Sequence, residues 1–383
     1  MAANRSLTLG VMPLTDAAPL IVALEKGFFA EENLDVTLVR EASWATIRDK
    51  VMFRALDAAQ MLAPMPLAMS FGLGHRPRPT IAPLVLSLNG NGITVSKALI
   101  EAIAAIAPAS LDARPIEAHG LAAVIRAREA EGAARLRFGV VFPHSTHHVQ
   151  LRAWLQAAGV DPESDIELLV VPPAQMAAEL EAGRLDGYCV GEPWNQLAVR
   201  AGLGRLLITS YEIWPHRAEK VLGLAETFAD QRPEILQALL RALIRAGIWL
   251  DRPDNRLEAA KLLVEGGWVR APIEIVGLSL MGVVADGQGG EPRTLPDMHV
   301  FSRHFANFPW IGHAELYAQA MVQNGQLARL PERWELAQIF RPDLYRKAAT
   351  AVGVPLPEDD IGPDMDDNIF TRWRNGLSAA DIA

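Results

Sequence analysis

Short strands of alternating apolar and polar residues recur along the first part of the chain, with helical segments between them. Residues 6–12 (SLTLGVM) and 34–40 (LDVTLVR) have the two-residue period of a β-strand. Helix-like segments follow each strand, at residues 18–32 and 44–56. Strands that alternate with helices predict parallel sheets whose faces are covered by those helices.

After a helical stretch at residues 96–134, the alternation of strands and helices starts again. Further strands are predicted at residues 135–142, 166–172 and 186–192. The pattern predicts an α/β protein of two lobes that close like a clamshell, with a small ligand in the cleft between them. We expect the first part of lobe 1 at residues 6–95, an inserted lobe 2 at 96–204, a return to lobe 1 with C-terminal helices at 205–345, and a C-terminal arm at 346–383.

Composition narrows the classes of function. The chain has 383 residues and a formal net charge of −9, which argues against a broad nucleic-acid surface, so no direct contact with nucleic acid is expected. Its single cysteine, Cys189, excludes an intramolecular disulfide and a cysteine-cluster metal site. The N-terminus has no pattern of a secretory leader and no apolar run is long enough for membrane insertion, so we expect a cytoplasmic protein. A mature domain whose leader has been removed would have the same pattern.

Polar side chains gather where two predicted helices begin. His144, Ser145, Thr146 and His147 start one helix, and Gln175 starts the next. A helix N-terminus offers unpaired N–H groups and a partial positive charge, which favour a bound anion. We therefore predict a pocket for a small oxyanion, without a catalytic centre, cofactor or metal ion.

Other interpretations of these residues stay open. His144 and His147 could bind a metal ion or only cap the helix, although no carboxylate or cysteine lies nearby in the sequence. Ser145 could be a nucleophile, but it lacks the GxSxG pattern of a nucleophile elbow. The segment Asn89–Gly90–Asn91 is either a tight connection between strands or a place where the backbone approaches a ligand.

Three further residues are candidates for the cleft. Trp44 could form a pocket wall or belong to the core. Glu192 would repel an anion unless it pairs with Lys220 or a histidine, or lies at the hinge between the lobes. Lys220 is the predicted fixed positive charge.

Several segments together resemble the nitrate- and bicarbonate-binding proteins of the ABC-transporter solute-binding class. They include ASWATIRDKV, LNGNGITVS, FPHSTHHVQLRAWLQAAGVDP, GYCVGEPWN and EIWPHRAEKVL, within residues 7–330. The resemblance implies a clamshell of the type II periplasmic-binding-protein fold. It also implies that nitrate or nitrite is held by Trp44, His147 (or His144) and Lys220, with Gln175 or Asn91 as the amide donor.

The chain also resembles the cytoplasmic nitrate/nitrite sensors that pair with an RNA-binding antiterminator, because it lacks an export signal and has GEPW in place of GDPW. We therefore expect a sensor that binds the anion and controls this partner in nitrate assimilation. The alternatives are a transport receptor for nitrate, bicarbonate or another small solute, and an enzyme similar to a pyrimidine-precursor synthase. We further expect a protonated His147, whose charge would make anion binding weaken as pH rises.

Overall fold

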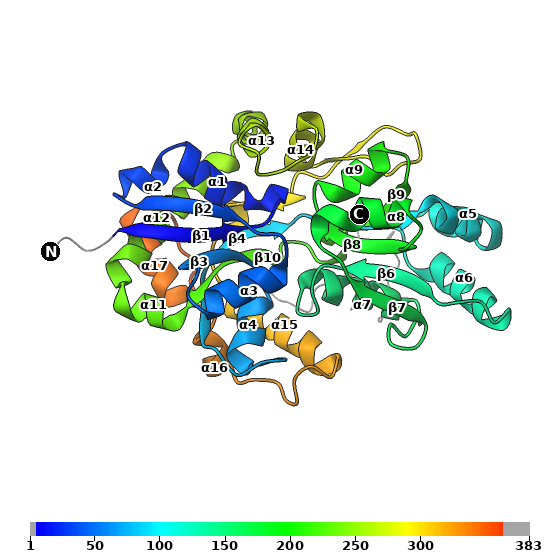
Figure 1. Cartoon of the computed structure of the whole chain (residues 1–383), viewed down its shortest axis with the longest axis horizontal. Helices are drawn as coiled ribbons and strands as arrows, with labels where there is room; N and C mark the ends of the chain where they lie inside the picture. The colour runs from blue at the N-terminus through cyan, green and yellow to red at the C-terminus, as the bar shows by residue number, and fades with distance from the viewer. Residues whose placement is uncertain (1–4, 363–383) are drawn as a thin grey trace.

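Two separate β-sheets, each with its own covering helices, form two lobes that lie side by side (Figure 1). The computed structural model describes residues 5–362. The predicted C-terminal arm at 346–383 lies largely outside these residues, and its expected start falls inside the helix Pro342–Ala351.

The first lobe contains a six-stranded mixed sheet in the order β13-β4-β10-β3-β1-β2. β1 pairs in parallel with β2 and β3, whereas β10 runs antiparallel to both β3 and β4. The strands of this sheet are β1 (Ser6–Val11), β2 (Asp35–Arg40), β3 (Ala58–Leu62), β4 (Thr80–Asn89), β10 (Ala218–Ala225) and β13 (His299–Val300).

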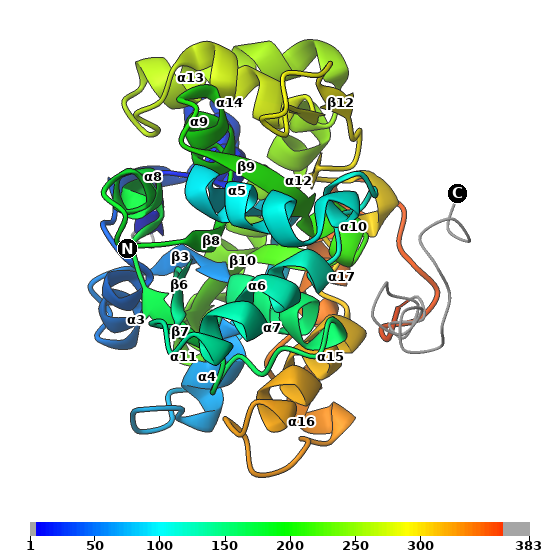
Figure 2. The same cartoon turned by 90° about the vertical axis from the view of Figure 1, so that its right-hand side faces the viewer.

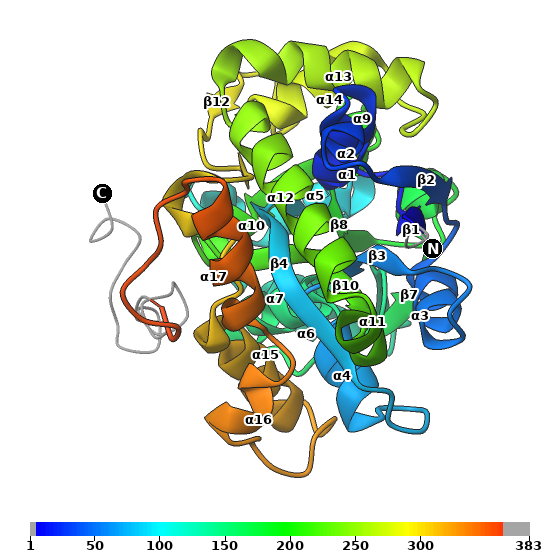
Figure 3. The ribbon, with the colours of Figure 1, turned by 90° about the vertical axis from the view of Figure 1, so that its left-hand side faces the viewer.

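Helices cover both faces of this sheet, and α12 and α17 lie in front of β4 when the lobe is viewed from its outer end (Figure 3). Apolar residues of β1, α1 and α12 pack into a common core, which includes Leu9, Leu20 and Leu239. The helices of the first lobe are α1 (Ala18–Glu25), α2 (Phe28–Glu31), α3 (Trp44–Met52), α4 (Met65–Phe71), α11 (Glu226–Gln231), α12 (Pro233–Leu250), α13 (Arg256–Glu265), α14 (Ile273–Leu280), α15 (Ile311–Gln323), α16 (Arg333–Ala337) and α17 (Pro342–Ala351).

The second lobe contains a five-stranded sheet in the order β7-β6-β8-β5-β9, with α5 and α6 in front of it in Figure 2. Its strands are β5 (Asn91–Ser96), β6 (Leu136–Val140), β7 (Ile166–Val170), β8 (Gly187–Gly191) and β9 (Gly204–Thr209). Its helices are α5 (Lys97–Ile106), α6 (His119–Ala130), α7 (Thr146–Ala157), α8 (Met176–Glu181), α9 (Trp194–Arg200) and α10 (Ser210–Ile213).

The strands lie close to their predicted positions in the sequence. Two of them, however, belong to the second sheet and not, as had been predicted, to the first. β5 and β9 both belong to the second sheet, although residues 91–95 were assigned to lobe 1 and residues from 205 on to its return. The sheets are also mixed, because β5 runs antiparallel to β8 and β9. Sequence periodicity shows that a segment is a strand, but the pairing partner depends on contacts that are distant in sequence.

The lobes are joined by two short connections, which form the hinge of the clamshell. One is Gly90, between β4 and β5, and the other is the segment from α10 to the start of β10. A hairpin of the C-terminal part, β11 (Val283–Val284) with β12 (Arg293–Thr294), also reaches the second lobe (Figure 1). There the Asp286 carboxylate pairs with Arg114 at 2.6 Å.

Candidate functional site

A buried charge cluster lies between the lobes, with Lys220 at its centre. The Lys220 ammonium donates to Oε1 of Glu219 at 2.8 Å and forms an ion pair with Oδ2 of Asp16, also at 2.8 Å. The ring of Trp44 lies 5.6 Å from Lys220 Nζ, within the range of a cation–π contact. All four side chains are at most 1% exposed, so the structure holds the lobes closed over them.

A β-bulge in β10 brings Glu219 and Lys220 to the same site. Ala218 pairs with Leu88 of β4 and Lys220 pairs with the adjacent Ser87, so Glu219 is an extra residue in the strand. In a regular strand, neighbouring side chains point to opposite faces of the sheet. The bulge breaks this alternation, and both charged groups reach the cleft.

The second lobe contributes the N-terminus of α7. Ser145 caps this helix by accepting the N–H of His148 at 3.0 Å, and its own hydroxyl donates to the carbonyl of Phe142. The Thr146 hydroxyl donates to Glu219 at 2.5 Å, and His147 Nδ1 lies 3.6 Å from the same carboxylate oxygen. The N-terminus of α7 in the second lobe therefore contacts the bulged strand β10 of the first lobe. The sequence predicted that this helix N-terminus lies at the ligand pocket.

Asp16 is fixed from the first lobe. Its Oδ1 accepts the side-chain amide of Gln60 at 2.6 Å, and Gln60 in turn accepts the backbone N–H of Met12 at 2.9 Å. The neighbouring Thr15 donates both its N–H and its hydroxyl to the carbonyl of Glu192 in the second lobe. These contacts link the start of α1 to the cleft wall.

The protonation states follow from burial. Burial raises the pKa of Asp16 and of Glu219 above the usual carboxyl values, although Lys220 opposes the shift. For Lys220, burial opposes the charge, but the two carboxylates outweigh it and raise the pKa. Burial, with the charge of Lys220, holds the pKa of His147 well below its usual value.

This lowered pKa disfavours the protonated form of His147 that was expected from the sequence. With both carboxylates ionised, the cluster carries one net negative charge, because a single ammonium faces two carboxylates. Placing an isolated negative charge in a dry, negatively charged space is costly. An anion bound here therefore requires either a proton on one carboxyl group or a rearrangement of these ion pairs.

Polar atoms of the closed site without a hydrogen-bond partner among the described residues include Trp44 Nε1, His147 Nε2, Asn91 Oδ1 and Asp16 Oδ2. All four lie on residues that are at most 1% exposed, and Asp16 Oδ2 faces the Lys220 ammonium. Buried polar atoms normally have partners, so unpaired atoms that face a cleft indicate where a ligand binds. The side-chain amide of Asn91 donates to Oε1 of Gln150 at 3.1 Å.

Several residues predicted for the ligand serve other purposes here. The hydroxyl protons of Ser145 and Thr146 are committed to protein acceptors, so neither residue is free to donate one to an anion. His144 is half-buried, with its ring against Phe142 outside the charge cluster. Gln175 is exposed at the end of a 3-10 turn and does not join the buried cluster.

The predicted residues around Gly90 lie at the hinge. Asn89 donates its side-chain amide to the carbonyl of Asp297 at 2.7 Å. Gly90 has φ +96°, and a Cβ there would lie 2.4 Å from the His299 ring, so this glycine approaches a histidine rather than the cleft. Of this segment, only Asn91 contributes an atom to the site.

Glu192 also belongs to the hinge. Its N–H donates to the Gly90 carbonyl at 2.9 Å, and its carboxylate accepts the N–H of Gln196 at 3.2 Å. Burial raises the pKa of Glu192 to about 8, so it is largely uncharged at neutral pH. Of the positions that the sequence left open for Glu192, the structure shows the one at the hinge, where its carboxyl group accepts a backbone N–H.

Two residues of the cluster, Asp16 and Glu219, were missed by the sequence analysis. Asp16 lies in the short 3-10 turn Thr15–Ala17 that precedes α1, and neither it nor Thr15 makes a capping bond at the start of that helix. Glu219 precedes Lys220 directly, which in a regular strand would send it to the opposite face. An acidic residue next to Lys220, in a strand whose other residues are apolar, was the signal that could have identified it.

The site offers no activated nucleophile in the described part of the chain. Ser145 is held by its capping bonds. Burial raises the pKa of the Cys189 thiol well above its usual value, which disfavours a reactive thiolate. The arrangement is suited to binding.

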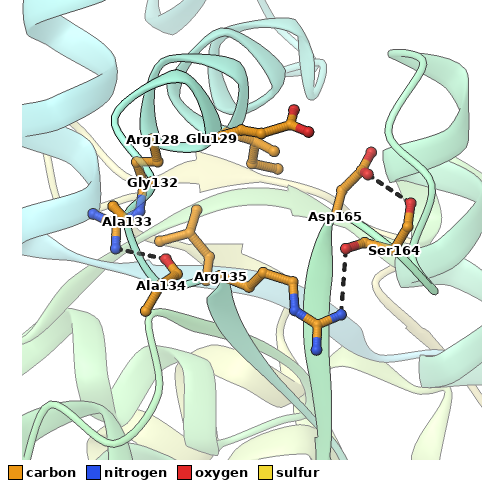
Figure 4. A pocket seen from close by; sticks show the side chains of 10 residues that line it. Arg128, Glu129, Gly132, Ala133, Ala134, Arg135, Ser164 and Asp165 are labelled. Atoms are coloured by element: carbon orange, nitrogen blue, oxygen red, sulfur yellow. Dashed lines mark hydrogen bonds between the residues drawn. The ribbon is translucent and has the colours of Figure 1, made fainter.

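A separate pocket opens on the surface of the second lobe, between the end of α6 and the start of β6 (Figure 4). Arg128 donates to the Ala134 carbonyl at 2.9 Å, and Arg135 donates to the Ser164 carbonyl at 3.3 Å. These arginines are engaged with the backbone, and the pocket lies on a different part of the protein from the unpaired atoms of the cleft.

Comparison with known proteins agrees with this picture. Residues 2–264 match the model of the NMT1-like family. The nitrate/nitrite binding protein NrtA of Synechococcus elongatus is 32% identical over 383 residues, covering 98% of this chain and 83% of that protein. The crystal structure of the periplasmic nitrate-binding protein NrtA from Synechocystis superposes with a TM-score of 0.88 at 29% identity, covering 98% of this chain and 99% of that one.

A further relative is the nitrate import ATP-binding protein NrtC of Synechocystis, 36% identical over 360 residues. The match covers 93% of this chain, which spans about half, 51%, of that relative. Among the described helices, none has the length and apolar composition needed to cross a bilayer.

The fold and the closed site together define a two-lobed solute-binding protein of the periplasmic-binding-protein class. The predicted clamshell is thus confirmed. The chain belongs to the NMT1-like family, among the solute-binding proteins related to NrtA.

Proposed function

We propose that this protein is the solute-binding receptor of an ABC-type importer and binds nitrate, or nitrite, between its lobes. The observation that carries the proposal is the pair of buried, unpaired nitrogens of Trp44 and His147 beside the Lys220 ammonium. The relatives named for nitrate binding and nitrate import support the choice of ligand and of role.

The donors suit a small planar anion. Trp44 offers one N–H, and neutral His147 offers one if its Nε2 carries the proton. Lys220 has three N–H groups, and two of them face carboxylates at 2.8 Å. Three donors from both lobes could therefore each reach one oxygen of nitrate, and closure of the lobes would bring them together.

A divalent anion fits this site less well. Sulfate would bring a second negative charge into a buried cluster that already has an excess carboxylate. We therefore expect nitrate to compete strongly and sulfate weakly. Bicarbonate has the same planar shape, and the site could accept it.

The sensor hypothesis remains a second proposal, and the comparisons favour the receptor. Control of an antiterminator and a cytoplasmic location both stay predictions. Gel filtration of the chain with an RNA-binding antiterminator encoded by a neighbouring gene, with and without nitrate, would detect a complex that dissociates when the anion binds. Cell fractionation would test the location.

Trp44→Phe provides the sharpest test, because it removes the indole N–H and leaves an aromatic ring beside Lys220. We expect nitrate affinity, measured by calorimetric titration, to fall about 10-fold, the loss of a hydrogen bond of about 1.5 kcal/mol to an anion. Trp249→Phe is the matched control, since it deletes an indole N–H from a half-buried tryptophan on α12.

Wild-type protein should bind nitrate and nitrite more tightly than sulfate in the same titrations. Equal affinity for nitrate in Trp44→Phe and the wild type would show that the anion binds elsewhere. Tighter binding of sulfate would refute the proposed ligand.

A further inference from the structure

Outside the cleft, two histidines and one aspartate converge on a single point. His216 Nε2 lies 2.9 Å from Oδ2 of Asp297, and His304 Nε2 lies 3.3 Å from the same oxygen. The two imidazole rings are 4.5 Å apart between centroids. The ligand atoms of His216, Asp297 and His304 all lie within 4.8 Å of one another, close enough to bind one metal ion.

The convergence is built by segments that are distant in sequence. His216 precedes β10, Asp297 precedes β13, and His304 lies in a 3-10 turn after β13. Both histidines have left-handed backbones, with φ +57° and +56°, which non-glycine residues seldom adopt. The backbone therefore accepts a modest strain while both rings point at one carboxylate.

Other groups hold Asp297 in addition to the two histidines. Asp297 Oδ1 already faces the guanidinium of Arg303 at 3.0 Å, which balances the carboxylate charge. The backbone carbonyl of Asp297 is fixed by the Asn89 amide at 2.7 Å. The second oxygen, Oδ2, is left for the two imidazoles, and supporting contacts of this kind orient the ligands of metal sites.

We propose that His216, Asp297 and His304 bind one divalent transition-metal ion, for which zinc is the best match. Two imidazole nitrogens and one carboxylate oxygen are a common zinc ligand set, with water in the fourth position. Tetrahedral bonds of this kind hold ligand atoms roughly 3.3 Å apart, close to the two observed spacings. The site is partly exposed, with His304 46% and His216 35% accessible, so an ion and its water can enter.

The position of the site gives it a role in lobe movement. His216 belongs to one of the two connections between the lobes, and Asn89, which holds Asp297, borders the other. A bound ion would tie both connections to the loop at residues 297–304. Zinc should therefore restrain the hinge.

Titration of zinc into tag-free, chelator-treated protein tests the proposal. We expect one zinc ion per chain with micromolar or tighter affinity. His304→Gln and Asp297→Asn should each weaken binding by about tenfold or more. Cobalt in place of zinc should give the visible absorption of a low-symmetry site in the wild type and lose it in both variants.

His119→Gln is the matched control, because His119 forms an exposed pair with Glu117 at 2.9 Å and should bind no ion. Circular dichroism would confirm that His304→Gln, at an exposed position, keeps its fold. Hydrogen exchange of residues 209–218 should slow with zinc in the wild type only. No saturable binding, or binding that both variants retain, would overturn the proposal.

Discussion

Glu219→Gln removes one of the two carboxylates that face Lys220 while keeping an acceptor oxygen for Lys220 and Thr146. In the wild type the cluster has one excess negative charge, so a bound anion should be accompanied by a proton. We expect that proton on the carboxyl groups of Asp16 and Glu219, whose pKa values burial already raises. His147 is a poor candidate for it, because burial and Lys220 lower its pKa.

The direction and the size of the change in nitrate affinity with pH follow from proton linkage. A nearby anion raises the carboxyl pKa further, so the complex holds more protons than the free protein, and affinity falls as pH rises. One coupled proton gives at most a tenfold change per pH unit, about 1.4 kcal/mol. Between pH 6.5 and 8.5 the wild type should therefore lose up to about 100-fold, or about 2.7 kcal/mol.

Glu219→Gln cancels the excess charge, so nitrate should bind more tightly than to the wild type at pH 8.5 and vary little with pH. Calorimetric titration in buffers of different ionisation enthalpy counts the protons taken up. Glu315→Gln is the control, because it makes the same change in a surface pair with Arg333. A wild type that takes up no proton, or a variant that keeps the wild-type slope, would refute the reasoning.

Three further changes test the same cluster and hinge. Lys220→Met leaves two buried carboxylates without their cation, so thermal melting should show a loss of about 3–5 kcal/mol at pH 8 that shrinks as pH falls; an unchanged melting curve would contradict the pairing. His147→Gln should weaken nitrate binding in the same titrations without altering the pH dependence of the affinity. If the pH dependence disappears in this variant, the His147 imidazole is the group that takes up the proton. Glu192→Gln should stabilise the protein at pH 8.5. With a folded pKa of about 8, the Glu192 carboxyl group destabilises the folded protein as pH rises from the usual carboxyl pKa through 8. The gain in unfolding free energy, on the order of 4 kcal/mol at most, is measured by denaturant unfolding at pH 5 and 8.5.

The sequence by itself determined the local elements and most of the polar groups that they carry. The two-residue period located β1 and β2, and Ser145 marked the start of α7, because period and capping are properties of a few adjacent residues. Trp44 and Lys220 were also identified, through the resemblance and through their place near helix and strand ends.

Only the tertiary structure decided how these groups combine. Asp16 meets Lys220 across more than two hundred residues, and the bulge in β10 turns Glu219 toward the cleft against the normal alternation. The charge state of His147 and Glu192 likewise depends on burial by the closed lobes. Pairing, register and burial arise from contacts between distant segments, whereas a sequence pattern records only what neighbouring residues favour.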